Sequence, residues 1–379
     1  MGITKATRIP GIDAWRAILM LFGIAYHGTM LRSPDVVFFK FIIHVSESCR
    51  MGVFFALSGF LAAYSLQRHE PLSWLKERLA SLGVVTVFGL AVLCPLTALA
   101  AFIAPEGDRL AHAFPQWYHI WFLVALLLYS PTAYLMHRLD DRHHILAQWE
   151  SDARLMRYAQ TLLLAVIPLI SLCLMQLIGS MVLRMASPAL FWQLWQMRLV
   201  IGYLPMFLLG FIVARSPLLL EKLTRSPALP GTIVAILGGS YIAWHIYSPA
   251  FSSGAHKAAQ DALLLGIGSA IAPPAMMMLV MRSALSIRHT KVILKRLADA
   301  SFTIYLVHLP IVIAINGAFS WVNWNELAEW TAAVVLTLLL SLVVHERLVR
   351  RSDLARLLFN GEIPRSRGAD PVGAHQRCR

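Results

Sequence analysis

The sequence of 379 residues is poor in charge. Asp, Glu, Lys and Arg make up 14% of it, whereas hydrophobic residues make up 58%. A soluble globular domain carries about 25% charged residues. Because long apolar runs replace the missing charge, the composition disfavours a soluble enzyme. It predicts an all-α, polytopic integral membrane bundle.

Cysteine is also scarce, with four residues: Cys49, Cys94, Cys173 and Cys378. There is no C-x-x-C pair and no spacing typical of zinc ligands, so we expect no disulfide framework and no bound metal or cofactor. Cys49 stands beside Arg50 and can be imagined as a covalent relay for a transferred group, although an isolated cysteine is usually inert.

Acidic residues are few relative to basic ones: 20 Asp and Glu stand against 33 Lys and Arg, which gives a net charge of +13. In a soluble protein this excess would suggest nucleic acid. In a membrane protein, Lys and Arg mark cytoplasmic loops and contact anionic lipid headgroups. We therefore expect membrane lipids, and no nucleic acid, as partners.

About ten apolar segments are long enough to cross a bilayer at about 20 residues each. Their expected ranges are 11–31, 50–66, 80–104, 118–136, 159–183, 195–214, 229–248, 260–281, 299–318 and 326–345.

Most of the 33 Lys and Arg fall on one side of these segments if the N-terminus is cytoplasmic. The positive-inside rule then places both termini on the cytoplasmic side of the plasma membrane. We expect one membrane domain over residues 1–362 and a polar, disordered cytoplasmic tail over residues 363–379.

The first segment contains RAILMLFGIAYH, which runs from Arg16 to His27. Eleven residues make about three helical turns, so both side chains point the same way, roughly 16 Å apart along the axis. Asp13 lies within pairing reach of Arg16. A polar stripe facing lipid is costly, which favours a stripe that faces a protein cavity. The simpler interpretation is that Arg16 reaches the headgroups and His27 meets interfacial water.

Other polar residues are expected at the depth of His27. Glu47 and Arg50 enter the second segment, His119 enters the fourth, and Tyr305 and His308 share one face of the ninth. Taken alone, His119 fits an aromatic interface belt and His308 a packed bundle histidine. Four segments that deliver polar groups to one depth instead predict a shared cavity.

Such a cavity has a plausible chemistry. An imidazole can take the proton of a hydroxyl as its oxygen attacks an activated acyl group, or can carry the acyl group itself. An arginine can hold a phosphate or carboxylate. A thin acyl carrier anchored at Arg16 would bring its reactive end to His27.

Three motifs resemble the membrane acyltransferase 3 family. The first is Arg16, ten residues and His27; the second is Phe54-Phe55-Ala56-Leu57-Ser58-Gly59-Phe60; the third is Tyr305-Leu306-Val307-His308-Leu309-Pro310. Asp13, the Arg50-Met51 pair, His119-x-Trp121-Phe122-Leu123 and the ending Leu358-Phe359-Asn360-Gly361 resemble the glucan biosynthesis protein C branch, which is linked to succinylation of periplasmic glucans.

The resemblance implies a ten-span enzyme in which His27 is the catalytic histidine and Arg16 contacts the acyl donor, with Asp13 orienting Arg16. Arg50 and His308 would support the site. Together with the residue pattern, this gives His27 and His308 as catalytic candidates. The substrate-binding candidates are Arg16, Asp13, Arg50, His119, Tyr305 and Glu47.

The expected function is transfer of an acetyl or succinyl group from a cytoplasmic acyl-CoA-type donor to hydroxyls of a periplasmic glycan. The first alternative is a non-enzymatic exporter of glycans or lipid-linked sugars, which the apolar stretch Ile18–Ile24 disfavours. The second is a metal enzyme or sensor built on Asp140-Asp141-Arg142-His143-His144, a cluster that is usually solvated.

Overall fold

The protein is described from a computed structural model. The structure describes residues 9–362 except 31–35, 105–116, 152, 188–189, 226, 228, 235, 238–254, 288, 290 and 323. For residues 48, 153–165, 168 and 255–270 it describes the backbone alone. The expected cytoplasmic tail and most of the expected segment 229–248 lie outside the described residues.

Every element in the described part of the chain is helical, which confirms the all-α prediction. The elements are α1 (Pro10–His27), α2 (Val37–Val45), η1 (Ser46–Arg50), α3 (Met51–Leu66), α4 (Pro71–Phe88), η2 (Gly89–Leu93), α5 (Cys94–Ile103), η3 (Tyr118–Ile120), α7 (Trp121–His143), α8 (Ile145–Ser151), α9 (Ala153–Met185), α10 (Phe191–Gly202), α11 (Leu204–Arg215), α12 (Pro217–Thr224), α14 (Ala255–Ser286), α15 (Val292–Phe319), α16 (Glu326–Val344), η4 (His345–Val349) and α17 (Asp353–Asn360).

Five of the described helical stretches are long and apolar enough to cross a membrane: Pro71–Ile103, Tyr118–His143, Phe191–Arg215, Val292–Phe319 and Glu326–Val349. Shorter apolar helices cover Met51–Leu66, Leu169–Met185 and Ile271–Ser286. The expected spans thus coincide with helices wherever they are described, while a total of about ten crossings stays a prediction.

Helix boundaries differ from the expected ones where local chemistry intervenes. The third expected segment begins early, at Pro71, because Pro at the first helical position and the Glu70 side chain start the helix before the apolar run begins. The sixth expected segment is interrupted at Tyr203, since Pro205 opens a second helix there. Residues 38–48 are helical in α2 and η1.

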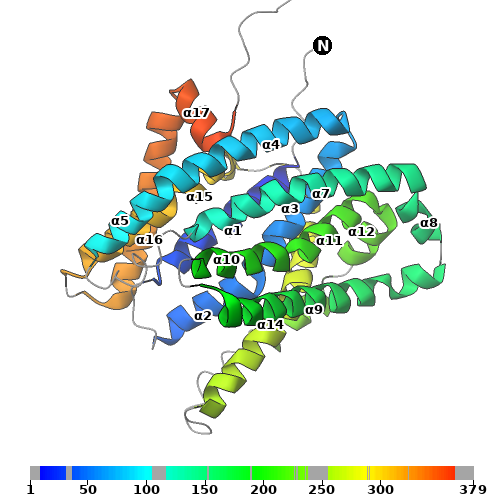
Figure 1. The fold of residues 1–379 in the computed structure, drawn as a ribbon, viewed down its shortest axis with the longest axis horizontal. Coiled ribbons are helices and arrows are strands. Elements are labelled where there is room, and N and C mark those ends of the chain that lie inside the picture. The colour runs from blue at the N-terminus through cyan, green and yellow to red at the C-terminus, as the bar shows by residue number, and fades with distance from the viewer. Residues whose placement is uncertain are drawn as a thin grey trace, which may run out of the picture.

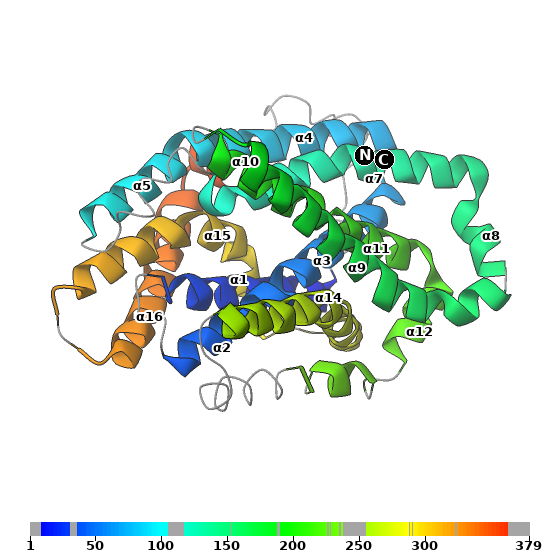
Figure 2. The ribbon, with the colours of Figure 1, turned by 60° about the horizontal axis from the view of Figure 1, so that its bottom comes forward.

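Helices α1 and α3 run through the middle of the bundle (Figure 1). α4 and α5 form a long rod along one edge, with α7 beside α4. α15 packs against both α1 and α16 in Figure 2 as in the contacts between elements. The central position of α1 and α3 surrounds their polar residues with protein.

The contact between α3 and α11 depends on two glycines. A Cβ atom on Gly59 would lie 1.9 Å from the Phe207 carbonyl oxygen, and one on Gly210 would lie 1.8 Å from the Ala56 carbonyl oxygen. The two backbones therefore touch directly, which only glycine permits. This packing explains the glycine in the motif Phe54–Phe60 as a structural requirement.

The C-terminal end of α1 is tied to α15 and α16 by polar side chains. Asn316 donates to the carbonyl oxygens of Gly28 and Met30, at 3.3 and 2.8 Å, and Trp330 Nε1 donates to the Ala25 carbonyl at 3.0 Å. The last carbonyls of a helix have no partner within the helix. The Trp330 bond satisfies one of them, the Ala25 carbonyl, and the three bonds together fix the backbone on both sides of His27.

Candidate active site

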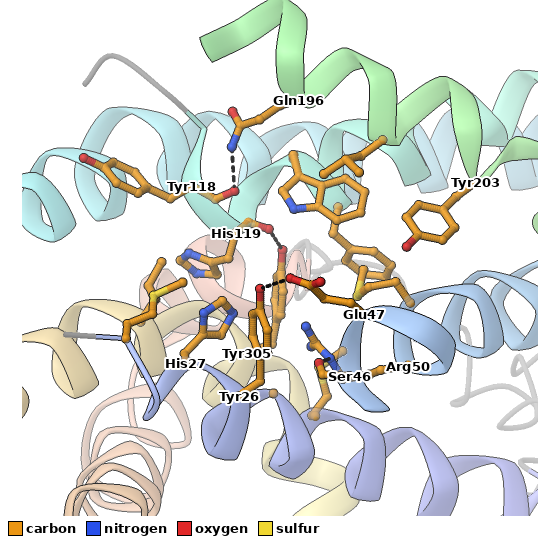
Figure 3. A pocket seen from close by; sticks show the side chains of 18 of the residues that line it. Tyr26, His27, Ser46, Glu47, Arg50, Tyr118, His119, Gln196, Tyr203 and Tyr305 are labelled. Carbon is orange, nitrogen blue, oxygen red and sulfur yellow. Dashed lines mark hydrogen bonds between the residues drawn. The ribbon is translucent and has the colours of Figure 1, made fainter. Parts of the chain in front are cut away.

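A cavity of about 540 Å³ opens beside the C-terminal end of α1. It is lined from α1, η1, α3, η3, α7, α9, α10 and α15, and Figure 3 shows labelled side chains from α1, η1, η3, α10 and α15 converging on it. The polar lining residues are Tyr26, His27, Ser46, Glu47, Arg50, Tyr118, His119, Gln176, Gln196, Arg198, Tyr203, Tyr305 and His308. A mixed polar and apolar cavity of this size can hold a small organic ligand.

Six of the eight residues predicted from the sequence line this cavity: His27, Glu47, Arg50, His119, Tyr305 and His308. Asp13 and Arg16 do not. On α1 the lining follows His27, Gly23 and Met20, one face of the helix, and stops about one turn short of Arg16.

Asp13 and Arg16 form the expected pair, with 3.7 Å between Arg16 Nη1 and Asp13 Oδ1. The Arg16 guanidinium also lies over the Phe54 ring, 5.9 Å from its centroid. Its side chain is 36% exposed. Arg16 is therefore accessible at the opposite end of the helix from His27, as the expected donor contact requires.

Three imidazole rings stand in a row at the cavity wall. The His27 and His308 ring centroids are 5.1 Å apart, and those of His308 and His119 are 5.2 Å apart. The Tyr305 hydroxyl donates to the His119 carbonyl oxygen. The residues come from α1, η3 and α15, so the fold assembles them from distant parts of the chain.

The Arg50 guanidinium is held over the same space. Its Nε donates to Ser46 Oγ at 2.8 Å, and its Cζ lies 5.3 Å from the Tyr26 ring centroid. A Cβ on Gly23 would be 2.9 Å from Arg50 Nη1, so the glycine leaves a notch for the guanidinium. No carboxylate in the described part of the chain lies within 4.0 Å of Arg50, although burying an unpaired charge is costly. This arrangement favours binding of a negative group.

Sequence reasoning missed several residues on the facing wall. Tyr26 donates to Glu47 Oε1 at 3.1 Å. Arg198 lies over the Trp195 ring at 3.8 Å, and its Nε is buried with no hydrogen-bond partner in the described part of the chain. The sequence candidates omit Arg198, whose charge alone indicates no site, and Tyr26, which directly precedes His27. The position of Tyr26 next to His27 was the one feature of the sequence that could have indicated these residues.

Gln196 was also missed, and it holds the turn that presents His119. Its Oε1 accepts from the Trp117 amide at 2.7 Å and its Nε2 donates to the Tyr118 carbonyl at 2.9 Å. Tyr118 has a φ of 43°, a strained value for a bulky residue. The two bonds hold the strained backbone that turns His119 into the cavity (Figure 3).

The acidic cluster at residues 140–144 forms an ion-pair network. Arg215 donates to Asp140 Oδ2 at 2.6 Å and to Asp141 Oδ1 at 2.7 Å. His137 Nε2 lies 3.1 Å from Asp141 Oδ2. Among the described residues, no group of three or more His, Cys, Asp or Glu is placed to hold a metal ion. The cluster thus ties α7 to α11 and gives no support to the metal hypothesis.

The cysteines described, Cys49, Cys94 and Cys173, are free thiols, and Cys378 lies outside the described residues. Cys49 Sγ contacts the Val45 carbonyl at 3.0 Å, within its own helix, and is not part of the cavity lining. This position gives no support to an acyl relay through Cys49.

The cavity therefore combines imidazoles that can move a proton, a guanidinium suited to a negative oxygen, and an apolar wall of methionine and glycine running down α1. These are the components needed to transfer an acyl group to a hydroxyl.

Comparison with known proteins adds a family match. A family model described as an acyltransferase domain matches residues 9–346, which include every candidate site residue. No curated protein and no solved structure matches the chain.

Proposed function

The chain belongs to the membrane acyltransferase 3 family and is a membrane enzyme that transfers acyl groups. On that premise we propose that it moves an acetyl or succinyl group from a cytoplasmic acyl-CoA-type donor to a hydroxyl of a periplasmic glycan, such as a glucan. The cavity shared by His27, His119, His308 and Arg50 is the observation that carries this proposal.

His27 is the proposed general base. Its side chain is half-buried and its Nδ1 is the buried nitrogen, so Nε2 is the nitrogen that opens on the cavity. As the glycan oxygen attacks the thioester carbonyl, a C–O bond forms and the hydroxyl proton passes to Nε2. When the C–S bond breaks, the same proton passes to the sulfur, which leaves as a thiol.

Arg50 is the proposed stabiliser of the negative oxygen that develops on the attacked carbonyl. Its guanidinium is fixed by Ser46 and by the Tyr26 ring, and it lies across α1 at Gly23, one turn before His27. A preorganised donor in a site shielded from water is worth about 10²- to 10³-fold in kcat.

The donor enters from the opposite end of α1 in this proposal. Arg16 binds a phosphate of the donor, and the thin acyl carrier follows Met20 and Gly23 toward His27. Met20 and Gly23, which line the cavity in the middle of α1, have no polar side chain. This lining suits a thin apolar chain better than a bulky sugar. This observation favours the enzyme over the exporter alternative.

The test uses purified protein in lipid vesicles with labelled acetyl-CoA or succinyl-CoA and a soluble β-glucan oligosaccharide. We expect His27→Ala to lower kcat by about 10²- to 10⁴-fold. Arg16→Ala should raise KM for the donor and leave kcat less affected, because Arg16 touches the donor away from the reacting carbonyl.

Equal label transfer by wild type, His27→Ala and Arg16→Ala would refute the site assignment. Movement of unmodified oligosaccharide across the vesicle membrane, without label on the glycan, would instead identify an exporter. Transfer from only one of the two donors would settle the acyl group.

A further inference from the structure

The hydrogen bonds of His308 define which of its nitrogens carries the proton. Nδ1 lies 2.6 Å from the Tyr305 carbonyl oxygen and 3.1 Å from that of Ile304. A carbonyl oxygen only accepts, so Nδ1 must be the donor. A neutral imidazole carries one N–H, which leaves His308 Nε2 as a lone-pair acceptor. This nitrogen is buried and has no partner in the described part of the chain.

His119 is fixed in the opposite tautomer by the same reasoning. Its Nε2 lies 3.0 Å from the Leu306 carbonyl oxygen and donates to it. Its Nδ1 is therefore an acceptor, and it too is buried without a partner among the described residues. His119 and His308 cannot satisfy each other, because each has only an acceptor left.

His27 is the third ring of the row, and no carbonyl in the described part of the chain sets its tautomer. Its Nδ1 is buried without a partner there. The ring next to it is that of His308, with 5.1 Å between the two centroids. This is the ring whose Nε2 is an unused acceptor. A buried polar nitrogen left unpaired is costly, so pairing these two nitrogens is favoured.

We propose that His308 is a positioning residue that accepts a hydrogen bond from His27 Nδ1–H and thereby keeps His27 Nε2 free as the base. The inference rests on the proposed acyl transfer. The two nitrogens are not within hydrogen-bond distance as the rings stand, so the pair requires the His27 ring to turn about its Cβ–Cγ bond. Catalytic hydrogen bonds are often long before substrate binds.

In the reaction, His308 stays neutral. His27 Nε2 takes the hydroxyl proton while Nδ1–H remains bonded to His308 Nε2, so the imidazolium keeps its orientation until Nε2 returns the proton to the leaving sulfur. The role is that of the orienting group in a catalytic triad, performed here by an uncharged ring.

A spectroscopic experiment tests the tautomer independently of turnover. Full-length protein with ¹⁵N-labelled histidine is reconstituted in lipid bilayers, and the His27 signals are identified by their loss in His27→Gln. We expect His27 to be protonated at Nδ1 in wild type and in His119→Gln, and to become a tautomer mixture in His308→Ala. Protonation at Nε2 in wild type, or an unchanged tautomer in His308→Ala, would overturn the inference.

A matched pair of variants separates positioning from proton transfer by His308 itself. The Gln amide in His308→Gln reaches the place of Nε2 and supplies an acceptor without titrating, whereas the shorter Asn in His308→Asn only replaces Nδ1. With acetyl-CoA and succinyl-CoA, His308→Gln should stay within about tenfold of the wild-type kcat, and His308→Asn should lose about 10²-fold or more. Equal losses in both would overturn the positioning role. A wild type with no transferase activity would refute the proposed function, and the tautomer measurement would still decide this inference.

Discussion

The substitution Gly23→Ala is expected to lower activity while leaving the fold intact. The added Cβ would lie 2.9 Å from Arg50 Nη1, against 3.4–4 Å for an ordinary contact. The atom it meets is the tip of a flexible side chain, so the guanidinium moves by about 0.5–1 Å while the helix stays in place. Only the position of Arg50 changes.

The magnitude follows from that displacement. A misplacement of 1 Å in a catalytic group costs about 10²-fold in rate, so we expect kcat to fall by about tenfold to 10²-fold. Stability should move in the opposite direction, because alanine is favoured over glycine in a helix interior by about 0.5–1 kcal/mol.

Gly83→Ala in α4 provides the matched control. A Cβ at Gly83 meets nothing within 4 Å, so this variant receives the same helix-propensity gain without touching the site. The assay compares acyl transfer from labelled acetyl-CoA and succinyl-CoA with thermal unfolding followed by tryptophan fluorescence. If Gly23→Ala keeps the wild-type kcat, the role given to Arg50 is refuted. If Tm falls in Gly23→Ala but not in Gly83→Ala, the space that Gly23 leaves for Arg50 is needed for stability and not for catalysis.

Three further outcomes are expected. Gln196→Ala should lower the free energy of unfolding by about 1–3 kcal/mol and reduce kcat, because it leaves the Trp117 amide and the Tyr118 carbonyl without their partner. Gln196→Glu keeps the acceptor for Trp117. Equal activity in wild type, Gln196→Ala and Gln196→Glu would contradict the role given to the turn at Tyr118. Gly59→Val should prevent folding, read as loss of a monodisperse peak in size-exclusion chromatography, since its Cβ would lie 1.9 Å from the Phe207 carbonyl oxygen. Glu70 accepts hydrogen bonds from the amides of Leu72 and Ser73, which lowers its pKa. The stability that Glu70 gives α4 is therefore present above the ordinary carboxyl pKa and is lost as the pH falls through the lowered pKa. In Glu70→Gln, Tm should fall less steeply with decreasing pH in this acidic range.

Much of the fold could be predicted from apolar run length, because that length is set by the bilayer and not by tertiary contacts. Helices occupy the expected segments wherever they are described. The expected segment 80–104 starts later than α4 because the apolar run begins only after Lys76 and Arg78, whereas Pro71 and Glu70 begin the helix regardless of charge. The break at Tyr203 was missed although Pro205 signals it.

The candidate site was predictable where a residue breaks an apolar run. His27, His119 and His308 are costly in such surroundings, and that cost is visible in the sequence. Gln196 and Arg198 sit near an expected segment end, where polar residues are common, and they become informative only when Gln196 on α10 is seen to bond to Tyr118 of η3. Which nitrogen of each histidine is available depends on carbonyl positions, which no residue pattern encodes.

The attachment of α1 has a consequence for how the protein is made. α1 carries Asp13, Arg16 and His27 and is not among the helices apolar enough to cross a membrane by composition. The groups that hold its C-terminal end, Asn316 and Trp330, belong to α15 and α16, which are synthesised well after α1. α1 therefore reaches its final position only after these two helices have been made, and a nascent chain remains inactive until α15 and α16 have been inserted.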